Sequence, residues 1–157
     1  MIEENSPMPS GELSQLVNGS MVTHKTTELF ANKKVVLFAV PGAFTPTCSV
    51  SHLPGYVVLA DQLAAKGIDQ IICLSVNDAF VMNAWGEAQN ADNIMMLADG
   101  SGSYSEALGL TMDTAAFGGV RSQRYAMVID NGVVSHLYVE KGNEFEVSKA
   151  EFILSHL

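Results

Sequence analysis

The spacing of apolar and polar residues predicts alternating strands and helices along most of the chain. Short apolar runs, rich in aliphatic residues at their centres, predict strands at residues 34–40, 68–76 and 94–98. Apolar residues at helical spacing follow residue 46 and stop at Lys66-Gly67, a typical helix end. Asn77-Asp78 caps another predicted helix, which includes Trp85. This alternation predicts an α/β domain with helices on both faces of a sheet.

Two Asn-Gly dipeptides, Asn18-Gly19 and Asn131-Gly132, lie between apolar segments and predict β-hairpins, because Asn-Gly tolerates the positive φ angles of a tight turn. The hairpins would join residues 13–17 to 21–24 and residues 125–130 to 133–140. The second one makes part of the central sheet antiparallel, so the predicted sheet is mixed. The remaining predicted elements are short helices at 26–30 and 104–108, a loop at 111–123 and a last helix at 147–157.

The composition suits a single domain, residues 1–157, with a sizeable core. The chain is 48% hydrophobic and 16% charged, and its length corresponds to about one domain. No apolar run approaches the roughly 18 residues that a membrane span requires. Residues 1–12 are polar and contain Pro7, Pro9 and Gly11, so we expect them to form a loosely held arm.

Charge and cysteine content exclude several classes of function. The net charge is −9 with only eight Lys and Arg residues, which argues against nucleic acid and anionic membranes as partners. The acidic, polar N-terminus lacks the features of a secretory signal, and a cytoplasmic location is therefore expected. Cys48 and Cys73 are too few for a disulfide scaffold and lack the paired spacing of a zinc site. We expect neither a metal nor another cofactor.

Cys48 is predicted to lie in the first turn of the first long helix. The preceding strand ends at Pro41-Gly42, after which Thr45 suits the N-cap and Pro46 the first helical position. Cys48 is then the third helical residue, where unpaired backbone N–H groups and the helix dipole favour a thiolate. It is therefore a candidate nucleophile. Pro54 should kink the helix beyond this reactive segment.

Four segments of the chain match the pattern of one known family. They are Pro41-Gly42-Ala43-Phe44-Thr45-Pro46-Thr47-Cys48, His52-Leu53-Pro54-Gly55-Tyr56, Leu74-Ser75-Val76-Asn77-Asp78-Ala79-Phe80-Val81 with Trp85, and Arg121-Ser122-Gln123-Arg124-Tyr125. Together they resemble the peroxiredoxins, in the branch of peroxiredoxin 5 and of the peroxiredoxin half of bacterial peroxiredoxin–glutaredoxin fusions. The resemblance implies a thioredoxin-like fold, a homodimer, and reduction of hydrogen peroxide and organic hydroperoxides through a cysteine sulfenic acid.

The resemblance also implies roles for individual residues. It makes Cys48 the peroxidatic cysteine, with Thr45, Pro41 and Arg124 around it. Arg124 would stabilise the thiolate and polarise the peroxide. Thr45 would accept a hydrogen bond from the peroxide proton while donating toward sulfur, and Pro41 would shield the thiolate from water. The residues expected to form the substrate pocket are Gly42, Phe44, Phe117 and Arg121.

The second cysteine does not match the pattern of relatives that form an internal disulfide. Cys73 lies within an apolar strand and is expected to be a buried thiol. In those relatives the resolving cysteine lies near the position of Val147. Its absence implies that an external thiol resolves the sulfenic acid, with glutathione or glutaredoxin favoured over thioredoxin.

Other functions remain as alternatives. A thioredoxin-fold module that senses redox state or acts as a chaperone would also use a single thiol. A cysteine phosphatase requires an arginine six residues after the nucleophile, where Pro54 stands. A Cys-x-x-Cys oxidoreductase requires a second cysteine where Ser51 stands. His52 follows Cys48 by one helical turn, and packing or cap bonding is its expected role rather than catalysis.

Overall fold

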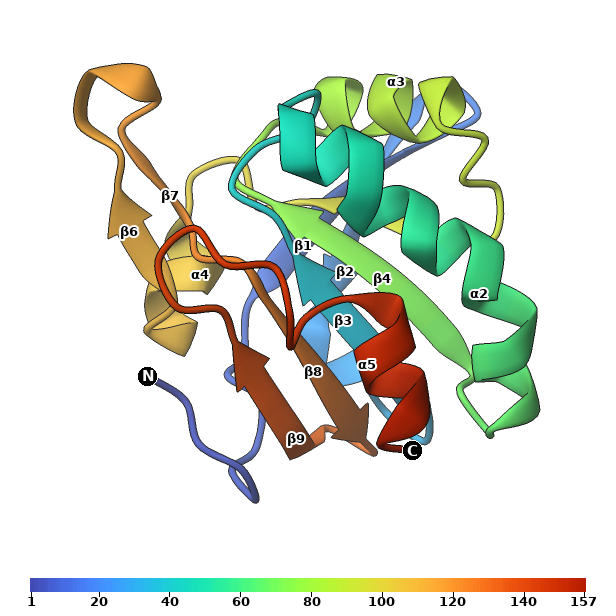
Figure 1. Cartoon of the computed structure of the whole chain (residues 1–157). Helices are drawn as coiled ribbons and strands as arrows, with labels where there is room; N and C mark the ends of the chain where they lie inside the picture. Colours follow the sequence, from blue (N-terminus) through green and yellow to red (C-terminus); the bar gives the residue numbers. More distant parts are fainter.

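The computed structural model describes all residues from 1 to 157, and its centre is a mixed sheet of seven strands in the order β2-β1-β5-β4-β3-β8-β9 (Figure 1). The strands are β1 (Glu12–Val17), β2 (Ser20–Lys25), β3 (Lys34–Ala39), β4 (Gln70–Ser75), β5 (Met95–Ala98), β8 (Tyr125–Asp130) and β9 (Val133–Val139). β3, β4 and β5 are parallel, whereas the other pairings are antiparallel. The predicted mixed sheet is confirmed.

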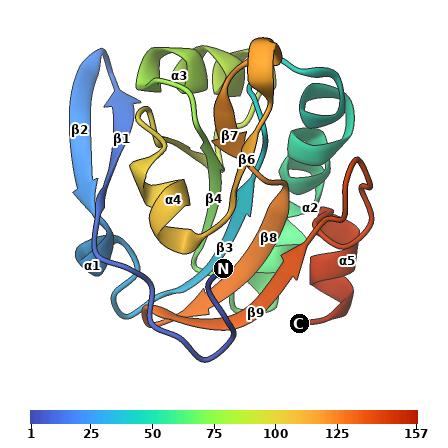
Figure 2. The ribbon, with the colours of Figure 1, turned by 90° about the vertical axis from the view of Figure 1, so that its left-hand side faces the viewer.

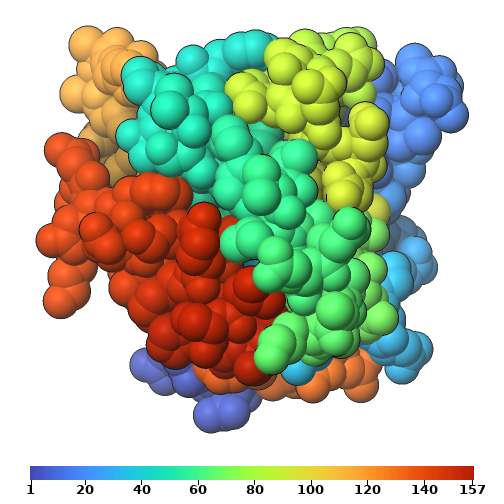
Figure 3. Space-filling model, turned by 45° about the vertical axis from the view of Figure 1, so that its right-hand side comes forward, coloured from blue at the N-terminus to red at the C-terminus, as the bar shows by residue number.

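Helices cover both faces of this sheet (Figure 2). They are α1 (Thr26–Leu29), α2 (Leu53–Ala65), α3 (Ala79–Ala88), α4 (Ser103–Leu108) and α5 (Ala150–Ser155). Residues alternate along a strand, so Val36 and Phe38 of β3 pack with α2, α3 and α5, while Val35 and Leu37 pack with α1 and α4. The C-terminal segment lies against α2 on the outer surface (Figure 3). None of the helices is both long and apolar enough to cross a membrane.

Both Asn-Gly dipeptides form the predicted hairpin turns. Asn18 and Gly19 have φ angles of 49° and 81°, and Asn131 and Gly132 have φ angles of 48° and 80°. Positive φ at both central positions is the geometry of a type I′ turn, whose twist matches that of the flanking strands. The hairpins β1–β2 and β8–β9 therefore follow directly from these local residues.

Three predicted segments differ in the structure. Residues 111–123 are not an irregular loop, because β6 (Thr111–Asp113) pairs with β7 (Val120–Ser122) in a small separate sheet. The N-terminal arm is held more firmly than expected, since Asn5 and Ser6 exchange backbone hydrogen bonds with Val134 of β9. The last helix begins only at Ala150, because the carboxylate of Glu140 binds the backbone N–H groups of residues 146 and 148 in a non-helical conformation.

The helix that carries Cys48 begins at Pro46, as predicted, and runs to Ala65 with a π-helical turn at Cys48–His52. Leu53 donates its N–H to the carbonyl of Cys48, five residues back. The predicted kink at Pro54 thus takes the form of a widened turn just before the proline. Pro54 has no N–H to donate and its ring would crowd the carbonyl four residues earlier, so a wider turn relieves both problems.

Candidate active site

Cys48 lies in the first turn of this helix, with its side chain fully buried. The first helical hydrogen bond joins the N–H of Ser49 to the carbonyl of Thr45, which makes Thr45 the N-terminal boundary of the helix. The backbone N–H groups of the turn that holds Cys48 have no partner within the helix, and such groups favour negative charge on sulfur. The position of Cys48 in the first helical turn and its burial together place the thiol in an electropositive environment that is shielded from solvent.

Arg124 reaches Cys48 from the opposite side. Its Nη2 donates to Sγ of Cys48 at 3.1 Å, and its Nη1 donates to Nδ1 of His52 at 2.8 Å. The plane of the guanidinium also lies near the ring of Phe145, with 5.8 Å between Cζ and the ring centroid. The guanidinium of Arg124 therefore donates to two acceptors at once. A lysine ammonium could not reproduce this planar geometry.

His52 is a buried, neutral partner of Arg124. Burial is the main cause that lowers its pKa to about 3, with a further contribution from the charge of Arg124. Nδ1 accepts from Arg124, so the ring proton lies on Nε2, which donates to the carbonyl of Ser148 at 3.1 Å. Both ring nitrogens are therefore engaged. The ring is unsuited to act as a base, and it holds the guanidinium in place.

The hydroxyl of Thr45 is directed differently from the expectation. It donates to the carbonyl of Gly42 at 2.7 Å, so its proton is not directed at sulfur. The expectation that Thr45 donates toward the thiol is therefore wrong for this state, because the turn places the carbonyl of Gly42 within hydrogen-bond distance of the hydroxyl. The oxygen of Thr45 keeps its lone pairs, which leaves it able to accept a hydrogen bond from a peroxide O–H.

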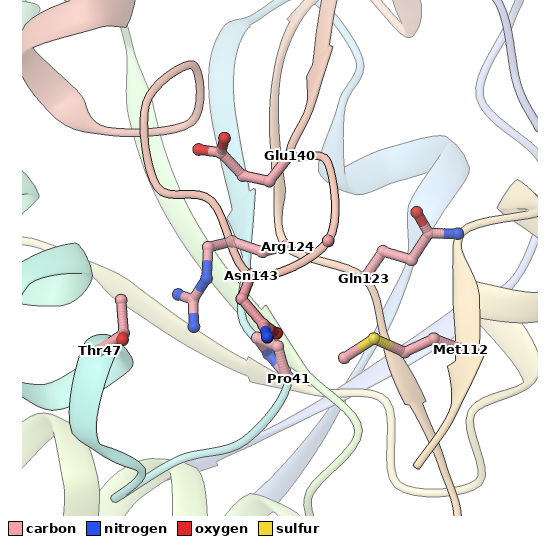
Figure 4. Close-up of a pocket in the computed structure, with 8 residues that line it drawn as sticks. Pro41, Thr47, Met112, Gln123, Arg124, Glu140 and Asn143 are labelled. Atoms are coloured by element: carbon pink, nitrogen blue, oxygen red, sulfur yellow. The ribbon is translucent and has the colours of Figure 1, made fainter.

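A polar cavity of about 330 Å³ adjoins Arg124 (Figure 4). It is lined by Pro41, Thr47, Met112, Gln123, Arg124, Glu140, Gly142 and Asn143. In the close-up, the guanidinium of Arg124 points toward the helix start at Thr47, while Gln123 and Met112 lie on the opposite side. Sequence reasoning placed Pro41 and Arg124 here but missed the other lining residues, which come from the helix start, strand β6, the segment between β7 and β8 and the loop after β9.

The four residues predicted for the substrate pocket do not line this cavity. Arg121 donates to the carbonyls of Gly118 and Val76, and these bonds tie the β6–β7 hairpin to the loop after β4. Gly42 lies close to Thr45, since an added Cβ would make a tight contact of 3.2 Å with Cγ2 of Thr45. Phe44 and Phe117 are 56% and 73% exposed at the surface. Phe44 lies in a turn and Phe117 lies on the hairpin, and both side chains face outward. The local sequence does not reveal this orientation.

Cys73 lies on β4, where it pairs with Phe38 of β3, and it is fully buried. Burial, followed by the neighbouring Cys48, raises the pKa of the Cys73 thiol well above its usual range. Both cysteines are unpaired. The expectation of a buried strand thiol is met, and Val147 occupies the loop before α5.

Two further contacts hold the turn and the helix start that surround Cys48. The indole Nε1 of buried Trp85 donates to Oγ of Ser49 at 3.0 Å. Oδ1 of Asn77 accepts from the N–H of Ala43 at 3.0 Å and from the hydroxyl of Ser75 at 2.7 Å. Sequence reasoning assigned Trp85 to the core and Asn77 to a cap, and it missed their contacts with the reactive segment.

Comparisons with known proteins agree with this arrangement. The model of the Redoxin family matches residues 3–154. The chain is 50% identical over 153 residues to Peroxiredoxin-2D of Arabidopsis thaliana, covering 96% of this chain and 94% of that protein. It is 47% identical over 136 residues to the hybrid peroxiredoxin hyPrx5 of Haemophilus influenzae, covering 84% of this chain and 56% of that protein. The crystal structure of reduced Prx3 from Vibrio vulnificus in complex with hydrogen peroxide is 67% identical, with a TM-score of 0.98 over 99% of both chains. This similarity confirms the predicted thioredoxin-like fold of the peroxiredoxin type.

Proposed function

The chain belongs to the Redoxin family and is a peroxiredoxin, a thiol-dependent peroxidase, and we propose that Cys48 performs its reaction in a one-cysteine cycle. The observation that carries the assignment is the 3.1 Å contact between Nη2 of Arg124 and Sγ of Cys48. A guanidinium at this distance stabilises negative charge on sulfur and can also donate to a bound peroxide.

The chemical step follows from these positions. The thiolate of Cys48 attacks one peroxide oxygen, an S–O bond forms, and the O–O bond breaks. Sulfur is oxidised to sulfenic acid, and the attacked oxygen keeps its proton as the sulfenic acid hydroxyl. The departing oxygen leaves as hydroxide or alkoxide and takes a proton from solvent water, which gives water or an alcohol. Arg124 faces the region where charge develops on the departing oxygen, and the hydroxyl oxygen of Thr45 can accept a hydrogen bond from the peroxide O–H. Pro41 lines the cavity beside Arg124, and its proposed role is to shield the thiolate from water.

An external thiol is proposed to complete the cycle. Condensation of this thiol with the sulfenic acid releases water and forms a mixed disulfide, and a second thiol then restores Cys48. The loop before α5 contains no cysteine, and Cys73 is held inside the sheet. The resemblance to peroxiredoxin–glutaredoxin fusions supports glutathione and glutaredoxin as reductants ahead of thioredoxin. A cytoplasmic location is also proposed, since both cysteines are unpaired and the cycle consumes reduced thiols.

Turnover measurements with separate reductants test this proposal. Peroxide consumption is measured with glutathione alone, with glutathione plus glutaredoxin, and with thioredoxin. We expect turnover with glutathione, faster turnover with glutaredoxin, none for Cys48→Ser, and parent rates for Cys73→Ser. Turnover supported by thioredoxin alone would overturn the choice of reductant. Peroxide reduction by Cys48→Ser at the parent rate would overturn the assignment of the thiol.

A homodimer is proposed from the exposed apolar residues near the site. Phe44, Val50, Phe80, Phe117 and Val120 are each at least 56% exposed. They lie on the helix start, α3 and the β6–β7 hairpin, which gather at one end of the molecule in Figure 1. A cluster of this kind is typical of an interface. Sedimentation equilibrium tests the proposal: a parent chain that stays monomeric at micromolar concentration contradicts it.

A further inference from the structure

Glu140 is a nearly buried carboxylate that directly follows strand β9. Its side chain is only 7% exposed, and a single oxygen, Oε2, accepts from the N–H of Glu146, the N–H of Ser148 and the hydroxyl of Ser148. The three distances are 2.9, 2.9 and 2.6 Å. Although burial opposes ionisation, these hydrogen bonds hold the pKa of Glu140 below its usual value. Glu140 is therefore an anion that fixes the loop at residues 146–148.

This carboxylate does not pair with the nearby guanidinium. No salt bridge joins Glu140 to Arg124, and in Figure 4 the carboxylate points away from the guanidinium. The two residues meet through the backbone instead, where the N–H of Glu140 donates to the carbonyl of Arg124 at 3.0 Å. The side chain of Glu140 is connected to the guanidinium of Arg124 by hydrogen bonds through the loop that it holds.

The loop delivers one carbonyl to the active site. The carbonyl of Ser148 accepts from Nε2 of His52 at 3.1 Å and from the hydroxyl of Tyr56 at 2.7 Å. Because this carbonyl takes the Nε2 proton, His52 presents the lone pair of Nδ1 to Nη1 of Arg124. The other arm of Arg124 is then directed at Cys48. A continuous path of hydrogen bonds runs from Glu140 through Ser148, His52 and Arg124 to the thiol.

We propose that Glu140 is a positioning residue for the peroxidase reaction, which acts through Ser148 and His52 to orient Arg124 on Cys48. The inference rests on the proposed roles of Cys48 and Arg124. Three other ionisable groups lie along the path. Tyr56 packs with His52, Glu151 lies near Tyr56, and burial keeps the thiol of Cys73 protonated. Glu140 is the anion that bonds directly to the path. If Glu140 binds Ser148 less strongly, the carbonyl of Ser148 shifts and the ring of His52 turns with it. The guanidinium of Arg124 then loses its alignment with Sγ of Cys48.

The variant Glu140→Gln tests this role, since it keeps the shape and removes the charge that strengthens three hydrogen bonds. Glu144→Gln is the matched control, because Glu144 is exposed on the same loop and its side chain makes no hydrogen bond. The measurement is the single-turnover rate of Cys48 oxidation by hydrogen peroxide as a function of pH. For Glu140→Gln we expect the rate of Cys48 oxidation to be about tenfold lower than in the parent. We also expect the midpoint of the pH profile of this rate to lie at higher pH. Glu144→Gln should match the parent.

A spectroscopic measurement separates positioning from general destabilisation. The nitrogen-15 shifts of His52 report which ring nitrogen carries the proton, and they should move in Glu140→Gln while the shifts of half-buried His24, on the distant strand β2, stay unchanged. Ser148→Ala removes one donor and keeps the carbonyl, so it should change the rate in the same direction by less. If Glu140→Gln does not fold, the rate and the His52 shifts of Ser148→Ala test the role of Glu140 in its place.

The outcomes distinguish the two levels of the proposal. The first outcome is that the parent reacts rapidly at Cys48, and Glu140→Gln has the same pH profile and the same nitrogen-15 shifts of His52 as the parent. The inference about Glu140 is then wrong, and the proposed function stands. Ser148→Ala replaces Glu140→Gln in this comparison if Glu140→Gln does not fold. If Cys48 of the parent does not react with hydrogen peroxide, the proposed function itself fails.

Discussion

Tyr125 lies directly opposite Ala39 in the antiparallel pairing of β8 with β3. This register puts Arg124, the residue before Tyr125, next to the turn that follows β3, which leads to Cys48. The alignment of the guanidinium with the thiol thus depends on the pairing of two interior strands of the sheet. A slip by one residue would direct Arg124 to the other face.

Arg124→Lys should lower the rate of Cys48 oxidation by about 100-fold, the size of loss found when a positioned donor is removed from a site where negative charge develops. Lysine keeps the positive charge but cannot serve Sγ of Cys48 and Nδ1 of His52 in one plane. Stopped-flow oxidation by hydrogen peroxide provides the measurement. Arg121→Lys is the control, since Arg121 binds backbone carbonyls only. Equal losses in both variants would contradict the assignment.

The buried His52 should make the protein less stable as the pH falls. Its pKa is lowered from 6.5 to about 3 in the folded state, so the unfolded chain binds one more proton between these values. Its contribution to stability is complete above pH 6.5 and is lost progressively toward pH 3. The slope is about 1.4 kcal/mol per pH unit within this window.

Urea unfolding of the parent and of His52→Asn across this window measures the effect. The variant lacks the titrating group, so its free energy of unfolding should depend less on pH. Glu140 also has a lowered pKa and loses its contribution only below its ordinary value of 4.5, which leaves the upper part of the window to His52. Parallel curves for the two proteins between about pH 5 and 6.5 would refute the assignment.

Ser49→Ala should destabilise the fold by about 1–3 kcal/mol, because it leaves the buried Nε1 of Trp85 without an acceptor. Urea unfolding measures this loss. Ser51→Ala serves as the control, since Ser51 lies exposed on the same π-helical turn and its side chain makes no hydrogen bond. If both variants unfold at the same urea concentration, the Trp85–Ser49 bond contributes nothing to stability.

Phe44→Asn should weaken the proposed dimer without destabilising the monomer. Phe44 has a φ angle of 63°, a left-handed conformation that costs a bulky residue about 1–3 kcal/mol and that asparagine tolerates. Its ring is 56% exposed, so little packing is lost within one chain. Sedimentation equilibrium measures association, and urea unfolding at low protein concentration measures the monomer. Unchanged association would remove Phe44 from the interface.

The sequence was sufficient wherever neighbouring residues determine the structure. The Asn-Gly dipeptides determine their turns through positive φ angles, and Asp78 caps α3 by accepting from the N–H of Val81. The helix start at Pro46 and the position of Cys48 in its first turn follow from local residues in the same way. Arg124 was located through the motif that it shares with Tyr125.

Features that depend on distant residues could not be predicted. The strands of the β6–β7 hairpin have three residues each and show no clear alternation. The partner of Arg124, His52, lies 72 residues away, and the partner of His52, Ser148, lies 96 residues away. No periodic pattern encodes such pairs. The hydrogen bond from Thr45 to Gly42 is local, yet either sulfur or the carbonyl could have accepted it, and only the geometry of the turn decides.

Trp85 is the only tryptophan of the chain, and its indole N–H is bonded to Ser49, the residue after Cys48. The tryptophan fluorescence of the unmodified protein therefore comes from a single indole that is hydrogen-bonded to the reactive turn. A rearrangement of this turn during oxidation or reduction changes the surroundings of the indole. Fluorescence of the unlabelled protein, excited where its four tyrosines do not absorb, thus reports on the state of the turn.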